Sequence, residues 1–435
     1  MRLPLQLFQS TAIGRTLLIA LLISDAIWGN VTQVQAAPDN LLKAAFVRGG
    51  HVWVKQHTGE EKQLTKDGEA SYPVWSYDGT WLAYFKSKDG ESRELWLYET
   101  KSDRHVKVYE GGAGNVQWSP NRNIAAFLDD GVLNKTDTAK LAEKPFENEA
   151  FGIGNYSWLP DGTGYLASTT AKRLPDGWTS PILYKIPLGA GTDESKMHRF
   201  FTLPSELKHG GVTVLSIGTT TFKWSADGKW IAFVVHPTAS WSADSDMLCL
   251  LSSNGKTFKA LDEMLANSSW FQWAPRTSKL AYIQGGLRMA LENKHLKVKE
   301  LPAFRPPQLT PPGYADGNFT WQNDDSLVVQ RSKESSWSQE PSERPLPVLV
   351  QVRVHSSEQK QISSPPGGFG DYSPWYGPSS EKLGWVRSDR TKASVMLGLP
   401  DGSQASVWVD SIDRGSNYYE QWDWRSVLSW YEGHR

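Results

Sequence analysis

The chain has 435 residues, with 46 basic and 47 acidic side chains, so its formal net charge is −1 at pH 7. It lacks the basic excess and the Lys/Arg runs that are typical of proteins binding nucleic acid or an anionic membrane surface. Its one cysteine, Cys249, excludes an intramolecular disulfide and suits a buried small hydrophobe, while its 21 tryptophans are unusually many.

The N-terminal segment has the features of an export signal. Arg2 and Arg15 give a basic start, the apolar run Thr16–Ile23 follows, and Val34–Ala36 offers small residues for cleavage. The apolar run is shorter than the roughly 20 residues that span a membrane. We therefore expect residues 1–36 to be a signal peptide and the protein to be secreted or to lie in the extracytoplasmic cell envelope. An uncleaved N-terminal membrane anchor is the alternative.

The rest of the chain is built from a repeated motif. An apolar or aromatic residue, a variable residue and a Trp precede a polar turn and then an apolar strand. The motif tryptophans are 40–66 residues apart. Repeats of short strands at about this period are typical of β-propellers, in which each repeat forms one blade. The seven copies are Tyr72–Gly79, Val116–Pro120, Tyr156–Gly162, Phe222–Gly228, Phe271–Pro275, Phe319–Asp325 and Pro374–Pro378.

The first copy illustrates the expected order within a blade. Strand A at 72–76 turns at Asp78–Gly79, where Gly tolerates a positive φ and Asp bonds its own backbone. Strands B, C and D follow at 81–85, 94–98 and 105–109. We expect each motif Trp to fill the space between neighbouring blades. The other B strands are expected at 124–128, 165–168, 230–235, 279–283, 327–330 and 382–386.

The two ends of the chain are expected to complete one blade together. Residues 44–48, 51–54 and 62–65 have the pattern of B, C and D strands, and Tyr418–Trp424 resembles the missing A strand. Joining them leaves no free sheet edge. The prediction is an all-β fold: a single β-propeller of four-stranded antiparallel blades over residues 37–435. Eight blades are preferred, and seven are the alternative if the weak second repeat is degenerate.

The copies Phe222–Phe233 and Tyr72–Phe85 resemble the blade repeat of TolB-like propellers, a WD40-like repeat. Its pattern is Trp-Ser-Pro-Asp-Gly followed by an apolar strand, and Trp118–Pro120 and Trp158–Gly162 match it in part. The resemblance implies a TolB-like β-propeller. It implies little about activity, because the motif residues are structural. The additional α/β domain of TolB is not expected, since the propeller pattern begins near Ala44.

Signatures of catalysis are scarce. Blades of this kind also occur in prolyl-oligopeptidase-type peptidases, whose nucleophile lies in a Gly-x-Ser-x-Gly elbow. The sequence has no such pentapeptide, and its nearest segment, Val214–Gly218, lacks the first Gly. It also lacks His-Glu-x-x-His, a calcium loop and a phosphate-cradling loop. We therefore expect no catalytic residue, metal or cofactor.

Three of the expected B–C loops carry a Trp among small polar residues. Such a Trp is costly to leave in water, so it either anchors its own loop or contacts a partner. The B–C loops of a propeller lie on one face, and charged neighbours share that rim. The predicted ligand-binding residues are Trp178, Trp241, Trp337, Arg173, Asp244 and Arg390.

We expect a monomeric, non-catalytic propeller that binds a protein or a cell-envelope glycan, and not nucleic acid, through this face. The alternative hypothesis is a polysaccharide lyase or hydrolase with its active site in the axial pocket. It requires ionisable groups to converge from different blades. A purely structural module is a third hypothesis, which predicts a large apolar patch and no pocket.

Overall fold

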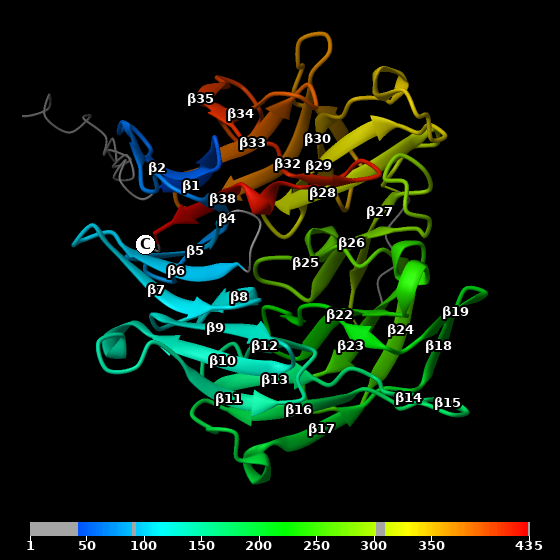
Figure 1. Cartoon of the computed structure of the whole chain (residues 1–435). Coiled ribbons are helices and arrows are strands. Elements are labelled where there is room, and N and C mark those ends of the chain that lie inside the picture. The colour runs from blue at the N-terminus through cyan, green and yellow to red at the C-terminus, as the bar shows by residue number, and fades with distance from the viewer. Residues whose placement is uncertain (1–41, 89–92, 302–308, 434–435) are drawn as a thin grey trace, which may run out of the picture. The chain divides into compact units, whose positions relative to one another are not determined.

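The computed structural model of the protein describes residues 42–88, 93–301 and 309–433. The predicted signal peptide lies outside these residues. The strands form eight successive antiparallel blades within one compact unit, so the expected all-β, eight-bladed propeller is confirmed (Figure 1). In the described segments the helices are single 3-10 turns of three to five residues. None of them is long and apolar enough to cross a membrane.

The blades are numbered in chain order, and each is given from its innermost strand A outward. Blade 1 consists of β38 (Leu428–Glu432), β1 (Leu42–Arg48), β2 (His51–Gln56) and β3 (Glu61–Gln63). Blade 2 consists of β4 (Glu69–Trp75), β5 (Trp81–Ser87), β6 (Glu94–Glu99) and β7 (Arg104–Glu110). Blade 3 consists of β8 (Gly114–Trp118), β9 (Ile124–Asp129), β10 (Val132–Asp137) and β11 (Glu147–Phe151). Blade 4 consists of β12 (Asn155–Trp158), β13 (Gly164–Ser168), β16 (Ile182–Pro187) and β17 (His198–Thr202).

The second half of the ring follows the same order. Blade 5 consists of a split A strand, β20 (Gly218–Thr219) and β21 (Lys223–Trp224), with β22 (Trp230–His236), β23 (Asp246–Ser252) and β24 (Phe258–Met264). The described part of blade 6 consists of β25 (Phe271–Trp273), β26 (Lys279–Gln284) and β27 (His295–Glu300). Blade 7 consists of β28 (Tyr314–Trp321), β29 (Ser326–Lys333), β30 (Val348–Arg353) and β31 (Gln359–Gln361). Blade 8 consists of β32 (Gly370–Gly377), β33 (Lys382–Ser388), β34 (Ala393–Gly398) and β35 (Ser406–Ile412).

Short hairpins and 3-10 turns lie in the connections between these strands. Three are hairpins: β14 (Arg173–Leu174) with β15 (Gly177–Trp178), β18 (Glu206–His209) with β19 (Val212–Leu215), and β36 (Ser416–Tyr418) with β37 (Gln421–Asp423). The 3-10 turns are η1 (Thr138–Lys140), η2 (Glu194–Lys196), η3 (Ala239–Ala243), η4 (Ser268–Trp270), η5 (Pro341–Glu343) and η6 (Trp424–Ser426).

The ring closes where β38 pairs with β1, with Ala44 opposite Trp430 (Figure 1). Closure by the two ends of the chain is confirmed, but the expected A strand at Tyr418–Trp424 is wrong. That segment pairs with itself as the β36–β37 hairpin and continues into η6. The strand that hydrogen-bonds to β1 starts at Leu428, four residues after Trp424. Its residues Leu428–Trp430 are an eighth copy of the motif.

The hydrophobic core lies between blades rather than within them. Apolar clusters join each blade to the next around the described ring, including the closing pair of blades 8 and 1. At that closing interface Val386 and Val409 of blade 8 share a cluster with Phe46 and Leu428 of blade 1. Since apolar burial is the main force for folding, an open ring would leave such a cluster in water.

The motif Trp recurs because its side chain connects neighbouring A strands by packing and by hydrogen bonds. In four of the seven copies its indole N–H donates to the backbone carbonyl of the residue that precedes the Trp of the previous blade. The four bonds of this kind run from Trp118 to Val74 (2.9 Å), from Trp158 to Gln117 (3.0 Å), from Trp273 to Lys223 (2.8 Å) and from Trp321 to Gln272 (3.1 Å). Four of the motif tryptophans, Trp75, Trp158, Trp273 and Trp321, are buried as the packing role predicts, whereas Trp118, Trp224 and Trp375 are half-buried.

The turn after the motif Trp is held by its own side chains. The Asp78 carboxylate accepts from the Thr80 backbone N–H, and the Ser76 hydroxyl accepts from the Trp81 N–H. Gly79 has φ +67°, and a Cβ there would lie 2.5 Å from the Tyr431 ring. This turn therefore requires glycine both for its backbone and for the closing strand.

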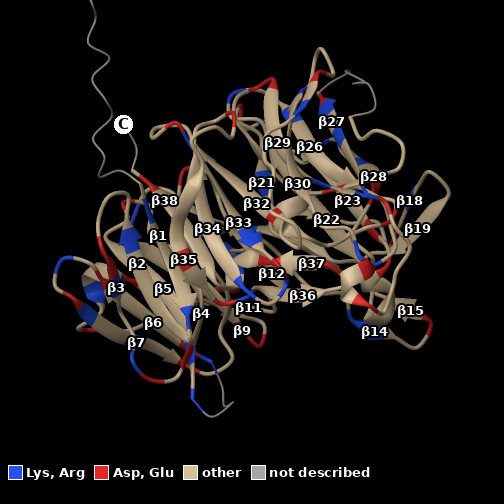
Figure 2. Cartoon of the chain, turned by 90° about the horizontal axis from the view of Figure 1, so that it is seen from above, with Lys and Arg blue, Asp and Glu red and all other residues tan. Residues whose placement is uncertain are grey.

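Charged residues of both signs are interspersed around the propeller (Figure 2).

Candidate functional site

Large apolar side chains that remain exposed gather on one face of the propeller. In antiparallel blades the B–C loops and the D–A connections emerge on the same side, which we call the loop face. Of the eight large hydrophobic side chains exposed in the described residues, six belong to it. They are Phe151, Leu174, Trp241, Leu287, Tyr314 and Tyr418, whereas Tyr77 and Val407 lie elsewhere.

The three loop tryptophans differ in their surroundings. Trp241, in η3, is 65% exposed. Trp178 is half-buried in the β14–β15 hairpin, where it pairs with the exposed Arg173. Trp337 is half-buried between the Arg344 guanidinium, 3.9 Å from its ring centroid, and the Tyr419 ring at 4.8 Å. Trp337 is therefore a loop anchor, while Trp241 offers a free aromatic surface.

A segment that the sequence placed in a strand instead crosses the loop face. Residues Asp413–Val427, here called the strap, connect β35 to β38 and include the β36–β37 hairpin. On blade 6 the Ala290 N–H donates to the Tyr419 carbonyl (3.0 Å) and the Gln421 side chain donates to the Arg288 carbonyl (2.7 Å). The strap therefore ties the end of blade 8 to blade 6.

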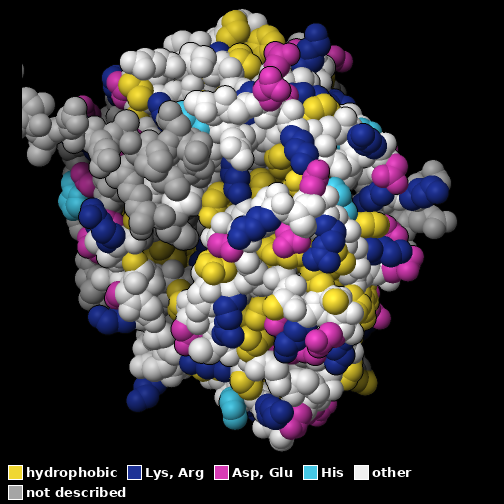
Figure 3. Space-filling model, turned by 90° about the vertical axis from the view of Figure 1, so that its left-hand side faces the viewer, with side chains coloured by type: hydrophobic (Ala, Val, Ile, Leu, Met, Phe, Trp, Pro, Cys, Tyr) yellow, Lys and Arg dark blue, Asp and Glu magenta, His cyan; other side chains and the backbone are white. Residues whose placement is uncertain are grey.

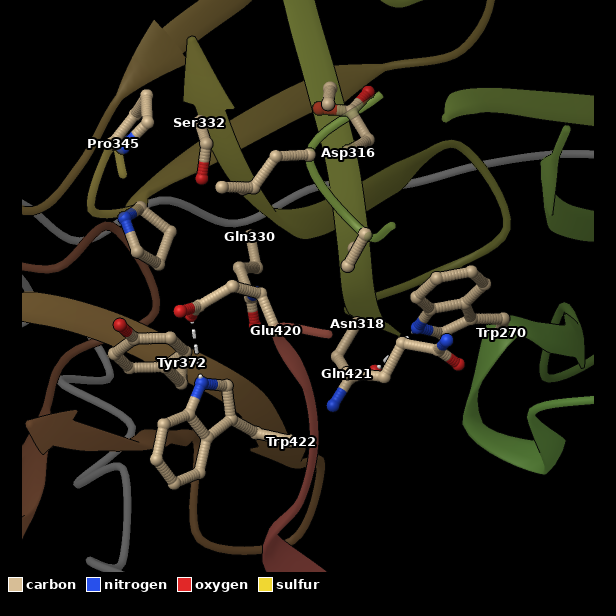
Figure 4. Close-up of a pocket in the computed structure, with 15 residues that line it drawn as sticks. Trp270, Asp316, Asn318, Gln330, Ser332, Pro345, Tyr372, Glu420, Gln421 and Trp422 are labelled. Atoms are coloured by element: carbon tan, nitrogen blue, oxygen red, sulfur yellow. Dashed lines mark hydrogen bonds between the residues drawn. The ribbon is translucent and has the colours of Figure 1, made fainter. Parts of the chain in front are cut away.

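The strap is held by a buried carboxylate. Glu420 accepts from Arg344 of blade 7 (3.1 Å), from Arg390 of blade 8 (3.0 Å) and from the Trp422 indole (3.1 Å). In Figure 4 the Glu420 and Trp422 side chains face each other beside Tyr372. Arg390 also donates to the Arg344 carbonyl (3.1 Å). Its guanidinium is thus engaged within the chain rather than presented on the rim.

Asp244 is likewise paired within the chain. Its carboxylate accepts two hydrogen bonds from Arg288, one of them at 2.7 Å from Nε, and these bonds hold the pKa of Asp244 below its usual range. The same Arg288 donates to the Tyr418 hydroxyl of the strap (3.1 Å). Neither Arg288 nor Glu420 stood out in the sequence, because each lies far along the chain from its partner.

Cavities lie on both sides of the strap. A small one beneath it has room for about one water molecule, about 20 Å³, and is lined by Trp270, Asn318, Gln330 and Gln421 among others (Figure 4). An open one of about 1000 Å³ lies against blades 7 and 8, lined by Arg344, Asp389, Arg390, Asp413, Arg414 and Trp422 among others. Glu420 lines both, so the strap separates them.

Ionisable groups also converge on the axis of the ring. Lys223 from blade 5 and Asp423 and Arg425 from the strap line cavities between the A strands. This is the kind of convergence that an axial active site requires and that a sequence cannot reveal.

On the side of the molecule seen in Figure 3, hydrophobic, basic and acidic side chains are mixed. The described part of that surface thus has no single-sign patch.

Parts of the sequence or the fold of this chain resemble those of several differently named proteins. No family model matches the chain. A curated relative, the "Uncharacterized peptidase YuxL" of Bacillus subtilis (strain 168), is 28% identical over 113 residues, which are 22% of this chain and 17% of that protein. A solved puromycin hydrolase has a TM-score of 0.52 at 11% identity, covering 81% of this chain and 55% of that one. A eukaryotic initiation factor has a TM-score of 0.52 at 11% identity, covering 85% and 86%.

These likenesses support the propeller fold alone. The chain spans about half the length of the puromycin hydrolase (55%) and matches a still smaller part of the curated peptidase (17%). The fold implied by the resemblance to TolB-like propellers is the fold observed.

Proposed function

We propose that the protein is a binding propeller that docks a protein partner through its loop face. The observation that supports this most is the gathering there of six of the eight exposed large apolar side chains of the described residues. Interfaces are enriched in aromatic side chains and Arg, and a few such residues supply most of the binding energy.

The best-defined part of this surface is a cluster of Trp241, Leu287 and Tyr418 around the Asp244–Arg288 ion pair. Hydrogen bonds connect its members: the Leu287 N–H donates to the Asp244 carbonyl (2.6 Å) and Arg288 donates to the Tyr418 hydroxyl (3.1 Å). Trp241 is linked to the pair through the bond from the Asp244 N–H to its carbonyl (3.0 Å). Three loops from different parts of the chain thus meet in one apolar patch with a charged centre.

The test is a photo-reactive amino acid placed at position 241, with position 407 as the matched exposed apolar control, in the cell envelope of the producing organism. We expect a discrete protein adduct from position 241 and none from 407. With that partner purified, Trp241→Ala should weaken binding about 30-fold, as for a hot-spot aromatic worth about 2 kcal/mol, and Val407→Ala should not. Equal adducts from both positions, or an unchanged affinity, would refute the proposal.

An enzyme that works at the axis is the second candidate. Lys223, Asp423 and Arg425 line the axial cavities, and two of the similar proteins are named as a peptidase and a hydrolase. This hypothesis predicts turnover of peptide or polysaccharide substrates by the purified chain and its loss in Lys223→Met. Absence of turnover across both substrate classes would leave binding as the function.

A further inference from the structure

Two adjoining cavities, here called the lobes of the axial channel, lie between the A strands. The lobes measure about 770 Å³ and 420 Å³, within the range of small-molecule sites. They share the lining residues Thr221, Ser268, Trp375, Arg425, Leu428 and Trp430. A ligand of several rings or residues therefore has room in it.

The repeat sets much of what faces this channel, although the motif tryptophans Trp375 and Trp430 line it as well. Because successive side chains of a strand alternate, the residue before each motif Trp points to the axis when the Trp packs between blades. Seven such residues line the two lobes: Val74, Gln117, Lys223, Gln272, Thr320, Pro374 and Ser429. Lys223 alone among these seven is charged.

The Lys223 ammonium is held in place with spare donor capacity. Its Nζ donates to the carbonyls of Ser268 (2.5 Å) and Phe271 (2.8 Å) and lies 4.4 Å from the Phe271 ring centroid. An ammonium has three N–H donors, so these two bonds leave one. Burial, and then the charge of Arg425, lower the pKa of Lys223 to about 7, because its charge is poorly compensated there.

Arg425, which belongs to the strap, contacts the same residue, Ser268. Its NH1 donates to the Ser268 hydroxyl, while its Nε donates to Asp423 at 2.8 Å. Two cations thus approach Ser268 from different elements, and the exposed Arg93 lines the larger lobe as well. Among the lining residues these three cations face one carboxylate, that of Asp423. The channel therefore carries an excess of positive charge.

The remaining lining suits a ligand rich in hydroxyl groups. Uncharged side chains that both donate and accept hydrogen bonds surround the cations, and the half-buried Trp375, which stacks on Trp430 with 4.8 Å between ring centroids, adds apolar surface for a sugar ring. The uncharged polar residues of the lining are Asn115, Gln117, Thr221, Ser268, Ser269, Gln272, Asn318, Thr320, Ser373 and Ser429.

We propose that the axial channel binds an acidic oligosaccharide, one of whose carboxylates is held between Lys223 and Arg425. Charge-assisted bonds from an ammonium and a guanidinium favour a carboxylate, and the amide and hydroxyl side chains pair with the sugar hydroxyls. Its lining does not include Trp241, Leu287 or Tyr418, so this site can be tested independently of the proposed protein-binding cluster.

Calorimetric titration of the full chain at pH 6 and low salt, where Lys223 with its pKa of about 7 is mostly protonated, tests the site. The probes are trigalacturonate, its methyl ester, trialanine with a free carboxylate, and inorganic sulfate. We expect trigalacturonate to bind at least tenfold more tightly than the other three. Lys223→Met and Arg425→Gln should each weaken it at least tenfold. Lys259→Met, at an exposed lysine on the outer strand of the same blade, should leave it unchanged.

Several outcomes would overturn the proposal. Equal affinity for trigalacturonate and its methyl ester would show that the carboxylate charge of the ligand does not contribute to binding. Tighter binding of trialanine makes the channel a peptide site, and equal binding of sulfate makes it a simple anion site. Because Lys223→Met removes two internal hydrogen bonds, its melting temperature is measured in parallel. Arg425→Gln changes an exposed side chain and provides the decisive variant if Lys223→Met fails to fold.

Discussion

At the residue scale, the repeated Trp combines two roles that no other side chain supplies together. Its rings fill the space between blades, and its indole N–H reaches the carbonyl of the previous A strand, as from Trp273 to Lys223 (2.8 Å). Phe fills a similar volume without the donor, and Tyr places its donor differently. This is why the motif recurs as Trp and why the repeat was recognisable.

Trp273, which is 7% exposed, separates these two roles. Trp273→Phe should lower the free energy of unfolding by about 1 kcal/mol, the usual worth of one hydrogen bond. Trp273→Ala should lower it by about 3–5 kcal/mol, as for a large aromatic removed from a core. Urea denaturation measures both, with Trp241→Ala expected to stay within about 0.5 kcal/mol. A Phe variant as stable as the parent would argue against the role of the N–H.

A second residue-scale prediction concerns Asp246, whose side chain is fully buried at the start of β23. Burial, reinforced by Glu263 and Asp244, raises the pKa of Asp246 to about 8. The unfolded chain loses this proton near pH 4 while the folded chain keeps it, so the group costs stability progressively from about pH 4 to about pH 8.

Asp246→Asn cannot titrate. Its free energy of unfolding, relative to that of the parent, should therefore rise as the pH increases from 5 to 8. Urea denaturation at several pH values measures this difference, with Asp193→Asn as the exposed control. A difference that does not change with pH would contradict the buried, protonated carboxyl.

At the element scale, the strap is fixed both by a buried ion-pair network and by Trp422, Trp424 and Val427, which belong to the core cluster of blades 8 and 1. Glu420 is 5% exposed and is the shared acceptor for Arg344 and Arg390, which come from different blades. Removing one partner of a buried ion pair costs more than the pair contributes, because charges remain buried without compensation.

Glu420→Ala should therefore lower the free energy of unfolding by about 3 kcal/mol. Hydrogen exchange should also speed up in Asp413–Val427 ahead of blades 2–4, because the strap is the part that loses its anchor. Glu99→Ala, which breaks the more exposed pair with Arg104, is the control and should cost less than about 1 kcal/mol. Unchanged exchange in the strap would mean that the hairpin is held by other contacts.

At the scale of the whole molecule, the ring depends on one short strand from the far end of the chain. β38 pairs with β1 and contributes Leu428 to the core shared by blades 8 and 1. Without it, β1 presents an unpaired edge, and such edges promote aggregation.

Removal of Leu428–Arg435 should therefore cause aggregation or a large drop in melting temperature, seen by light scattering and calorimetry. A matched variant replaces the exposed segment Ser416–Tyr418 with Gly-Ser-Gly and keeps β38. It should keep the oligomeric state of the parent chain. A truncated chain with the oligomeric state and melting temperature of the parent would contradict closure by β38.

Most of the fold was predictable because it rests on local rules. Each blade carries its own Trp, turn and alternating strands, so the blade order, the eight-blade count and the shared terminal blade followed from the sequence. The A strand of that blade was misplaced because Tyr418–Trp424 and Leu428–Glu432 are both rich in aromatics. Only pairing with β1 distinguishes them.

The candidate site was predictable in part. Trp178, Trp241 and Trp337 were expected on one face, because blade topology alone puts B–C loops there. Their partners were not predictable. Trp337 packs on Tyr419, Asp244 pairs with Arg288, and Arg390 pairs with Glu420. Whether each residue binds a ligand stays a prediction.

The sequence by itself determined the repeat, its strand order and the Trp that marks each copy. These are properties of neighbouring residues, governed by strand alternation and turn chemistry. Only the tertiary structure decided that the strap crosses the loop face and that Lys223 meets Arg425 at Ser268. It also decided that two expected rim charges, Asp244 and Arg390, are engaged within the chain. Those contacts join residues from different blades, and their energies depend on burial and distance, which arise only when the ring closes.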